Sequence, residues 1–158
     1  MTIRRVYIET TIISYLTSRP SRDLVQAAWQ QQTRQWWESR RRRFDLFVSQ
    51  FVLDEAADGD GEAAARRMES LVGIPVLVTE PAAVELAEVL LARRLLPPKA
   101  ATDALHLSMA TVHRMDVLLT WNCKHLANPV RLAGINRAIR AAGLEPPFVY
   151  TPHELMED

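Results

Sequence analysis

Residues 99–122, KAATDALHLSMATVHRMDVLLTWN, indicate the fold class because they join two kinds of secondary structure without a break. The first part, residues 99–114, is rich in alanine and predicts a long helix, since alanine has the highest helix propensity. The second part, residues 116–120, is a short apolar run that predicts a buried strand. A helix that leads directly into a buried strand is typical of an α/β fold.

The same alternation extends to both sides of this stretch. Further strands are predicted by short β-branched or aromatic runs at residues 4–8, 44–49, 74–78 and 148–150. Helices are predicted between them, at about residues 23–41, 51–57, 62–71, 82–94 and 130–142. Right-handed crossovers between such strands build a mainly parallel sheet of four to five strands, covered by helices on both faces. We find no repeat or linker, so residues 1–158 are expected to form a single domain.

Composition is that of an ordinary globular domain, with 48% hydrophobic and 24% charged residues. No apolar run approaches the roughly 20 residues that a membrane helix needs, and the N-terminus lacks the features of a secretory signal, so we expect a cytoplasmic protein without membrane contact. The 19 acidic and 19 basic residues balance, so net charge predicts no affinity for nucleic acid. The unbroken run Arg40, Arg41, Arg42 and Arg43 is either a phosphate-binding patch or a solvated helix end.

Candidate functional residues follow from a rule of open parallel sheets, in which ligands bind outside the carboxyl ends of the strands. Glu9 ends the first predicted strand, and Glu55 follows the second, with Asp54 as a rival. Asn122 follows the predicted strand at 116–120. Asp103 lies in the first turns of the alanine-rich helix among small apolar residues, an unusual setting for an acid on a solvent-exposed face. Taken singly, each of these acids could equally be an exposed strand end or a first-turn acid favoured by the helix dipole.

Two other kinds of site are disfavoured. His106 and His113 lie on one predicted helix, but neither has a partner at the spacing of a zinc site. A nucleotide-binding protein of the same architecture would carry a glycine-rich phosphate loop, and no such motif is present among the five glycines.

Four segments in order make a more specific pattern: VYIETTIISYL at 6–16, SQFVLDEA at 49–56, KAATDALHLSMA at 99–110 and DVLLTWNCKHLA at 116–127. Together they resemble the PIN-domain family, in particular the VapC-like toxins of type II toxin–antitoxin systems. The resemblance spans residues 6 to about 154. It implies a three-layer α/β/α PIN-like fold and a Mg²⁺- or Mn²⁺-dependent endoribonuclease that cleaves single-stranded RNA. It also implies a cognate antitoxin protein and a homodimer.

The resemblance assigns roles residue by residue. Glu9, Glu55 and Asp103 would bind one or two Mg²⁺ or Mn²⁺ ions, which are hard cations that take oxygen ligands. Asn122 would complete the catalytic set at a fourth position that is usually Asp. Three hydroxyls would orient the carboxylates, and Thr11 is expected instead to cap the strand end. These three residues are Thr10, Ser14 and Thr120.

Two residues depart from the pattern of the family. Glu9 is one methylene longer than the usual Asp, so its carboxylate reaches farther and has more rotamers. Asn122 is neutral, which removes a negative charge and predicts weak occupancy of any second metal site. The departures leave open a second hypothesis, a PIN-like binding or regulatory module with weak or no nuclease activity.

Overall fold

The computed structural model describes residues 2–156, and its centre is a five-stranded sheet in the order β3-β2-β1-β4-β5. Each strand pairs in parallel with its neighbours. The expected parallel α/β sheet is therefore confirmed. The strands are β1 (Arg5–Ile8), β2 (Asp45–Ser49), β3 (Val76–Leu77), β4 (Val117–Leu119) and β5 (Phe148–Tyr150).

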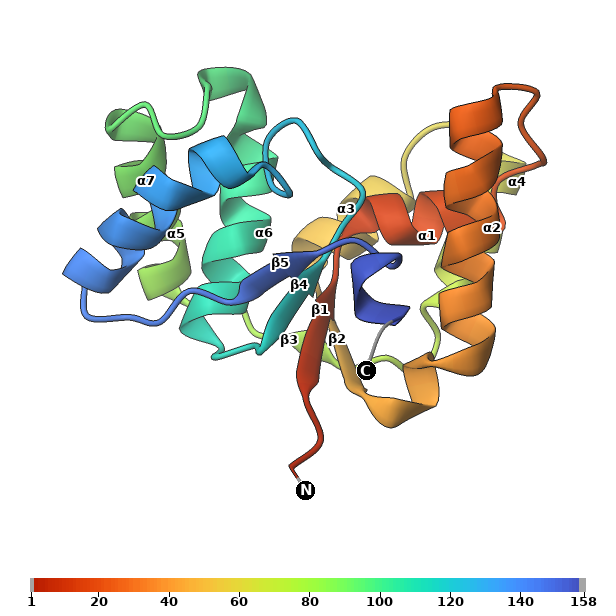
Figure 1. Ribbon diagram of the computed structural model, residues 1–158, viewed down its shortest axis with the longest axis horizontal. Helices are drawn as coiled ribbons and strands as arrows, with labels where there is room; N and C mark the ends of the chain where they lie inside the picture. The colour runs from red at the N-terminus through yellow and green to blue at the C-terminus, as the bar shows by residue number, and fades with distance from the viewer. Residues whose placement is uncertain (1, 157–158) are drawn as a thin grey trace.

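The helices of the described chain lie in two groups on either side of the sheet (Figure 1). One group is α1 (Thr10–Thr17), α2 (Leu24–Ser39), α3 (Gln50–Ala56) and α4 (Gly61–Ser70). The other is α5 (Pro81–Ala92), α6 (Ala101–Val112) and α7 (Pro129–Ala141). Short 3₁₀ turns occur at Arg41–Arg43, Pro98–Ala100 and Glu154–Met156.

The two groups follow from the order of the strands. The chain moves from β1 outward to β2 and β3, and then returns to place β4 on the other side of β1. Right-handed crossovers in opposite directions put their helices on opposite faces of the sheet. The direction of winding therefore changes between β1 and β4. Such a switch point leaves a crevice outside the carboxyl ends of the two strands, where ligands bind in folds of this kind.

Helix α1 is not among the helices predicted from the sequence, because the segment after β1 is rich in Thr and Ser. It forms two turns because Glu9 caps it, accepting a hydrogen bond from the backbone N–H of Thr11. Ile12 and Ile13 of this helix are fully buried. Tertiary packing therefore overrides the weak helix propensity of the segment.

The core fills the space between the sheet and both helical layers. Val6, Ile8 and Leu118 of the central strands are fully buried, as expected for a parallel sheet covered on both faces. Trp36 is also fully buried, whereas its neighbour Trp37 is half-buried, with the guanidinium of Arg41 4.2 Å from its ring centre. No helix within residues 2–156 is long and apolar enough to cross a membrane.

Candidate metal and active site

Glu9 lies at the switch point, immediately after β1 and beside the end of β4. Its backbone N–H donates to the carbonyl of Leu119 at 3.1 Å, which extends the β1–β4 ladder by one residue. Its side chain is turned into the protein, since only 3% of the residue is exposed. The strand-end rule thus predicted the position of Glu9, and the fold adds that the carboxylate is buried.

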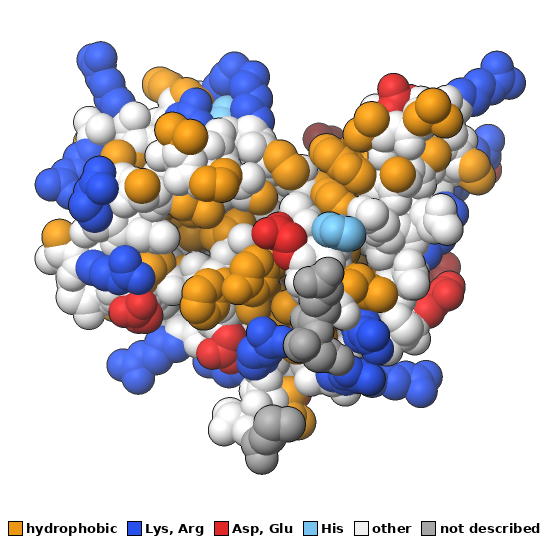
Figure 2. Space-filling model, in the orientation of Figure 1, with side chains coloured by type: hydrophobic (Ala, Val, Ile, Leu, Met, Phe, Trp, Pro, Cys, Tyr) orange, Lys and Arg blue, Asp and Glu red, His pale blue; other side chains and the backbone are white. Residues whose placement is uncertain are grey.

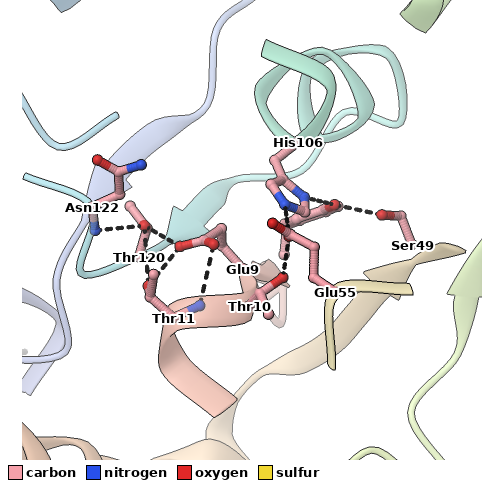
Figure 3. Close-up of polar contacts among 9 residues, drawn as sticks. Glu9, Thr10, Thr11, Ser49, Glu55, His106, Thr120 and Asn122 are labelled. Atoms are coloured by element: carbon pink, nitrogen blue, oxygen red, sulfur yellow. Dashed lines mark hydrogen bonds and ion pairs between the residues drawn. The ribbon is translucent and has the colours of Figure 1, made fainter. Parts of the chain in front are cut away.

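Three donors hold the carboxylate of Glu9 (Figure 3). Oε1 accepts from the hydroxyl of Thr11 at 2.6 Å and from the hydroxyl of Thr120, while Oε2 accepts from the backbone N–H of Thr11 at 3.1 Å. These bonds compensate the charge for its burial. A carboxylate offers about four acceptor positions, so about one position remains, on Oε2.

Glu55 reaches the same place from α3. Its Oε1 accepts from the hydroxyl of Thr10 at 2.6 Å and lies 2.6 Å from Nε2 of His106 (Figure 3). Burial alone would raise the pKa of Glu55, but the hydrogen bonds from His106 and Thr10 outweigh it, so the pKa lies below its ordinary value. The rival acid, Asp54, is exposed and accepts from Gln50 instead.

His106 completes the group, although its spacing along the sequence matches no zinc site. It is fully buried on α6, and its Nδ1 lies 2.7 Å from the hydroxyl of Tyr7. One ligand atom from each of Glu9, Glu55 and His106 lies within 4.8 Å of the others. His106 shares a helix face with Asp103, three residues earlier, which is the one sequence signal that could have included it.

Asp103 does not belong to this group of three. Its Oδ2 lies 3.0 Å from Nδ1 of His125, in the loop after β4, and 19% of its side chain is exposed. Its predicted role as a metal ligand therefore stays a prediction, and the pairing with His125 was not foreseen.

Asn122 holds the loop after β4 rather than facing Glu9. Its Oδ1 accepts from the backbone N–H of His125 at 3.0 Å, and its own N–H donates to the hydroxyl of Thr120 at 2.9 Å. Figure 3 shows its carboxamide turned away from the carboxylate of Glu9. The geometry indicates that Asn122 stabilises the loop after β4, and its predicted catalytic role remains untested.

The hydroxyls behave partly as expected. Thr10 and Thr120 orient Glu55 and Glu9 respectively. Thr11, expected only to cap the strand end, also orients Glu9 and accepts from the N–H of Trp121 at 2.9 Å. Within residues 2–156, the side chain of Ser14 makes no hydrogen bond to either carboxylate. No contact therefore supports its expected role in orienting them.

The arginine run lies at the amino end of β2, whereas the acidic group lies at the carboxyl ends of the strands. Arg40 follows α2, and Arg41–Arg43 precede β2, whose far end at Ser49 leads to the acidic group. The length of β2 separates the two, roughly 15 Å at about 3.3 Å per residue. The run therefore does not line the site, and binding of nucleic acid there stays a prediction.

The crevice at the site is visible on the surface. Figure 2 shows the molecule hollowed between the two groups of helices, above the carboxyl ends of the strands, with Lys and Arg side chains on one rim and apolar side chains on both walls. Two carboxylates that approach one another in such a crevice repel unless a cation lies between them. The residues present therefore fit a divalent cation with oxygen ligands.

Comparison with known proteins places this fold. No protein-family model matches the sequence, and no characterised protein is a significant sequence relative. The chain is similar to a solved chain of VapBC2 from Rickettsia felis, bound to a DNA fragment from its promoter, with 13% identity, a TM-score of 0.58, and coverage of 93% of this chain and 98% of the other. It is also similar to VapC20 of Mycobacterium tuberculosis, a toxin that cleaves the sarcin–ricin loop, with 16% identity, a TM-score of 0.60, and coverage of 78% and 95%. The fold is the PIN-like, VapC-like fold that the four segments predicted.

Proposed function

We propose that this protein is a metal-dependent ribonuclease, with Mg²⁺ or Mn²⁺ bound at Glu9 and Glu55. The observation that supports this most is the convergence of the two carboxylates at the β1–β4 switch point, each with an acceptor position that no described protein donor uses. When bound, the ion would lower the pKa of a water to give a nucleophile for phosphodiester hydrolysis. Asp103 stays a proposed further ligand.

The residues around the carboxylates prepare them for this role. Thr11 and Thr120 fix Glu9 between β1 and β4, and Thr10 fixes Glu55 against α1. Ligands that are held before the metal arrives lose little freedom on binding it, which strengthens binding. The sheet and α6 exclude water from one side of the group, while the 40% exposed side chain of Glu55 leaves the other side open to substrate.

Single-stranded RNA is the proposed substrate, and a cognate antitoxin the proposed partner. Both rest on the likeness in fold to a VapBC complex and to a toxin that cleaves RNA. We further propose that the protein works in the cytoplasm as the toxin of a toxin–antitoxin pair, and as a homodimer.

Cleavage of a labelled single-stranded RNA in the presence of Mg²⁺ or Mn²⁺ tests the proposal. We expect Glu55→Gln to lower the rate by roughly 100-fold, because it removes one of two charges that hold the cation. Asp54→Asn is the matched control, since this exposed neighbour on α3 accepts from Gln50, lies outside the acidic group and should leave the rate unchanged. Asp103→Asn measures whether Asp103 contributes.

The rival function is a binding or regulatory module without nuclease activity. It would be supported if wild type, Glu55→Gln and Asp103→Asn gave the same background cleavage with and without metal. Co-expression with the product of a neighbouring small reading frame tests the partner separately. A toxin should arrest growth alone and be relieved by that product, whereas a module should do neither.

A further inference from the structure

A chain of four hydrogen-bonding side chains runs from the interior of the protein to the acidic group (Figure 3). The hydroxyls of Ser49 and Tyr7 lie 2.6 Å apart, the Tyr7 hydroxyl lies 2.7 Å from Nδ1 of His106, and Nε2 of His106 lies 2.6 Å from Oε1 of Glu55. Ser49, Tyr7 and His106 are fully buried. The direction of each bond therefore depends on these four groups alone.

Counting protons fixes the direction. Within residues 2–156, the one hydrogen-bond partner found for the Ser49 hydroxyl is Tyr7. If Tyr7 donated its proton to Ser49, the buried proton of Ser49 would have no acceptor, at a cost of about 1–3 kcal/mol. Ser49 therefore donates to Tyr7, and Tyr7 donates to His106.

The tautomer of His106 follows. A ring nitrogen that accepts a hydrogen bond carries no hydrogen, so Nδ1 is bare and the neutral ring carries its hydrogen on Nε2. That hydrogen points at Oε1 of Glu55, which also accepts from Thr10. In this arrangement every proton of the chain has an acceptor, and the last acceptor is a carboxylate.

We infer that His106 is a positioning residue that donates to Glu55 and is not itself a metal ligand, so that the site binds its cation through oxygen atoms alone. The inference rests on the proposed function and specifies its metal site. Although Nε2 is close enough to join a ligand set, it presents a hydrogen rather than a lone pair. The oxygen that remains for the cation is Oε2 of Glu55, which no donor within residues 2–156 contacts.

The inference has a consequence for the class of metal. Oxygen ligands suit hard ions such as Mg²⁺ and Mn²⁺, whereas an imidazole nitrogen favours Zn²⁺, Ni²⁺ and Cu²⁺. The opposite arrangement, with the hydrogen on Nδ1 and the lone pair of Nε2 on the metal, would make a mixed site. The two arrangements differ in one proton position, which spectroscopy measures directly.

Long-range ¹H–¹⁵N spectra of the metal-free protein, labelled at histidine, test the tautomer. We expect His106 in the Nε2–H form, with signals that vanish in His106→Gln and remain in His113→Gln at the end of the same helix, where Nε2 of His113 donates to the carbonyl of Val78. Tyr7→Phe removes the donor to Nδ1 but leaves the carboxylate of Glu55 as the acceptor at Nε2, so the same ring should keep its hydrogen on Nε2. An Nδ1–H tautomer or a doubly protonated ring in the wild type would overturn the inference. The tautomer itself is measured on the wild type, and the variants serve only to assign its signals to His106.

Pulsed EPR of the protein loaded with Mn²⁺ tests the ligand set. We expect no coupling to a directly bound nitrogen, and a strong imidazole coupling would overturn the inference. His106→Leu should weaken Mn²⁺ binding by about 10–100-fold, as loss of a residue that orients a ligand does. His106→Gln should recover most of that loss, because its amide N–H can still donate to Glu55.

The outcomes separate the two proposals. If Mn²⁺ binds through oxygen atoms alone but the protein does not cleave RNA, the inference about His106 holds and the proposed ribonuclease function is wrong. If a nitrogen ligand binds Mn²⁺ and the protein cleaves RNA with metal, the inference about His106 is wrong and the ribonuclease function holds. Failure of Mn²⁺ to bind overturns both the oxygen-only site and the metal-dependent nuclease.

Discussion

The hydrogen bond between Thr10 and Glu55 offers a test of the site that needs neither metal nor RNA. Thr10 begins α1 and is 8% exposed, and its hydroxyl donates to Oε1 of Glu55 at 2.6 Å. Thr10→Val keeps the branched shape and removes only this donor. Glu55 then keeps one donor, His106.

The size of the effect follows from the setting of the bond. Hydrogen bonds to charged groups contribute about 1.5–3 kcal/mol when both partners are buried. Because 40% of the Glu55 side chain is exposed, water replaces part of the lost bond, and we expect the free energy of unfolding at pH 7 to fall by about 1–1.5 kcal/mol. For a chain of this length that corresponds to a fall in Tm of roughly 2–6 °C.

The pH dependence identifies the bond. The pKa of Glu55 is lowered in the folded protein, so its stabilisation is present above the ordinary pKa of the carboxyl and is lost as the pH falls through the folded value. Urea denaturation of wild type and Thr10→Val between pH 7 and about pH 3, below the ordinary Glu value of about 4.3, should show the difference shrinking with acid.

Thr17→Val is the matched control on the same helix. Its hydroxyl donates to the backbone carbonyl of Ile13 at 2.9 Å, a group that does not titrate, so its effect should stay constant with pH. If Thr10→Val and Thr17→Val lost the same stability at every pH, the bond to the Glu55 carboxylate would not contribute as described and the reasoning would be refuted.

Three further predictions concern the neighbours of this bond. Glu9→Gln should remove the gain in stability that Mn²⁺ gives the wild type, about 2.7 kcal/mol at 100 times Kd, as measured by thermal denaturation; an equal gain in the variant would exclude Glu9 as a ligand. Asn122→Leu should lower the free energy of unfolding by about 1 kcal/mol because it leaves the N–H of His125 unpaired, whereas Asn122→Asp should keep the bond and the stability, both followed in urea. Because burial raises the pKa of Tyr7, its phenol should ionise only as alkali unfolds the protein, so the tyrosinate absorbance of wild type and Tyr7→Phe should coincide at every pH at which both are folded.

The sequence predicted the architecture well because its signals are local. Apolar runs alternating with helical patterns require only the periodicity of each segment, and the five strands occur where they were expected. Two details needed the tertiary structure. Helix α1 forms on a Thr-rich segment because Glu9 caps it, and β3 is reduced to Val76–Leu77 although the apolar run began at Ile74. Pro75 explains part of the loss, since it has no N–H to donate, although its carbonyl still accepts from Val48.

The members of the candidate site could be named only in part from the sequence, and the limit is again physical. Glu9 and Glu55 were found because carboxyl ends of parallel strands meet at one edge of the sheet. His106 was missed because its partners are distant along the chain, 51 residues away in Glu55 and 99 in Tyr7. No periodicity encodes contacts at such separations. Asp103 illustrates the same point, since its partner His125 lies in a loop that no pattern connected to α6.

The longer side chain of Glu9, the first departure from the family pattern, is held in place by its neighbours. The extra methylene of Glu9 should have added rotamer freedom, yet Thr11 and Thr120 hold its carboxylate from two strands' ends at once. The longer side chain is therefore fixed, and its one unused acceptor position favours a single bond to a cation.

Asn122 removes a charge from the site but stabilises the loop that carries His125, which in turn contacts Asp103. Glu9 and Glu55 are the two carboxylates that converge at the switch point. Two carboxylates balance one divalent cation, whereas a second cation would find an amide in place of a carboxylate at Asn122. The arrangement therefore favours one tightly bound ion over two, and calorimetric titration with Mn²⁺ that found two tight sites would contradict it.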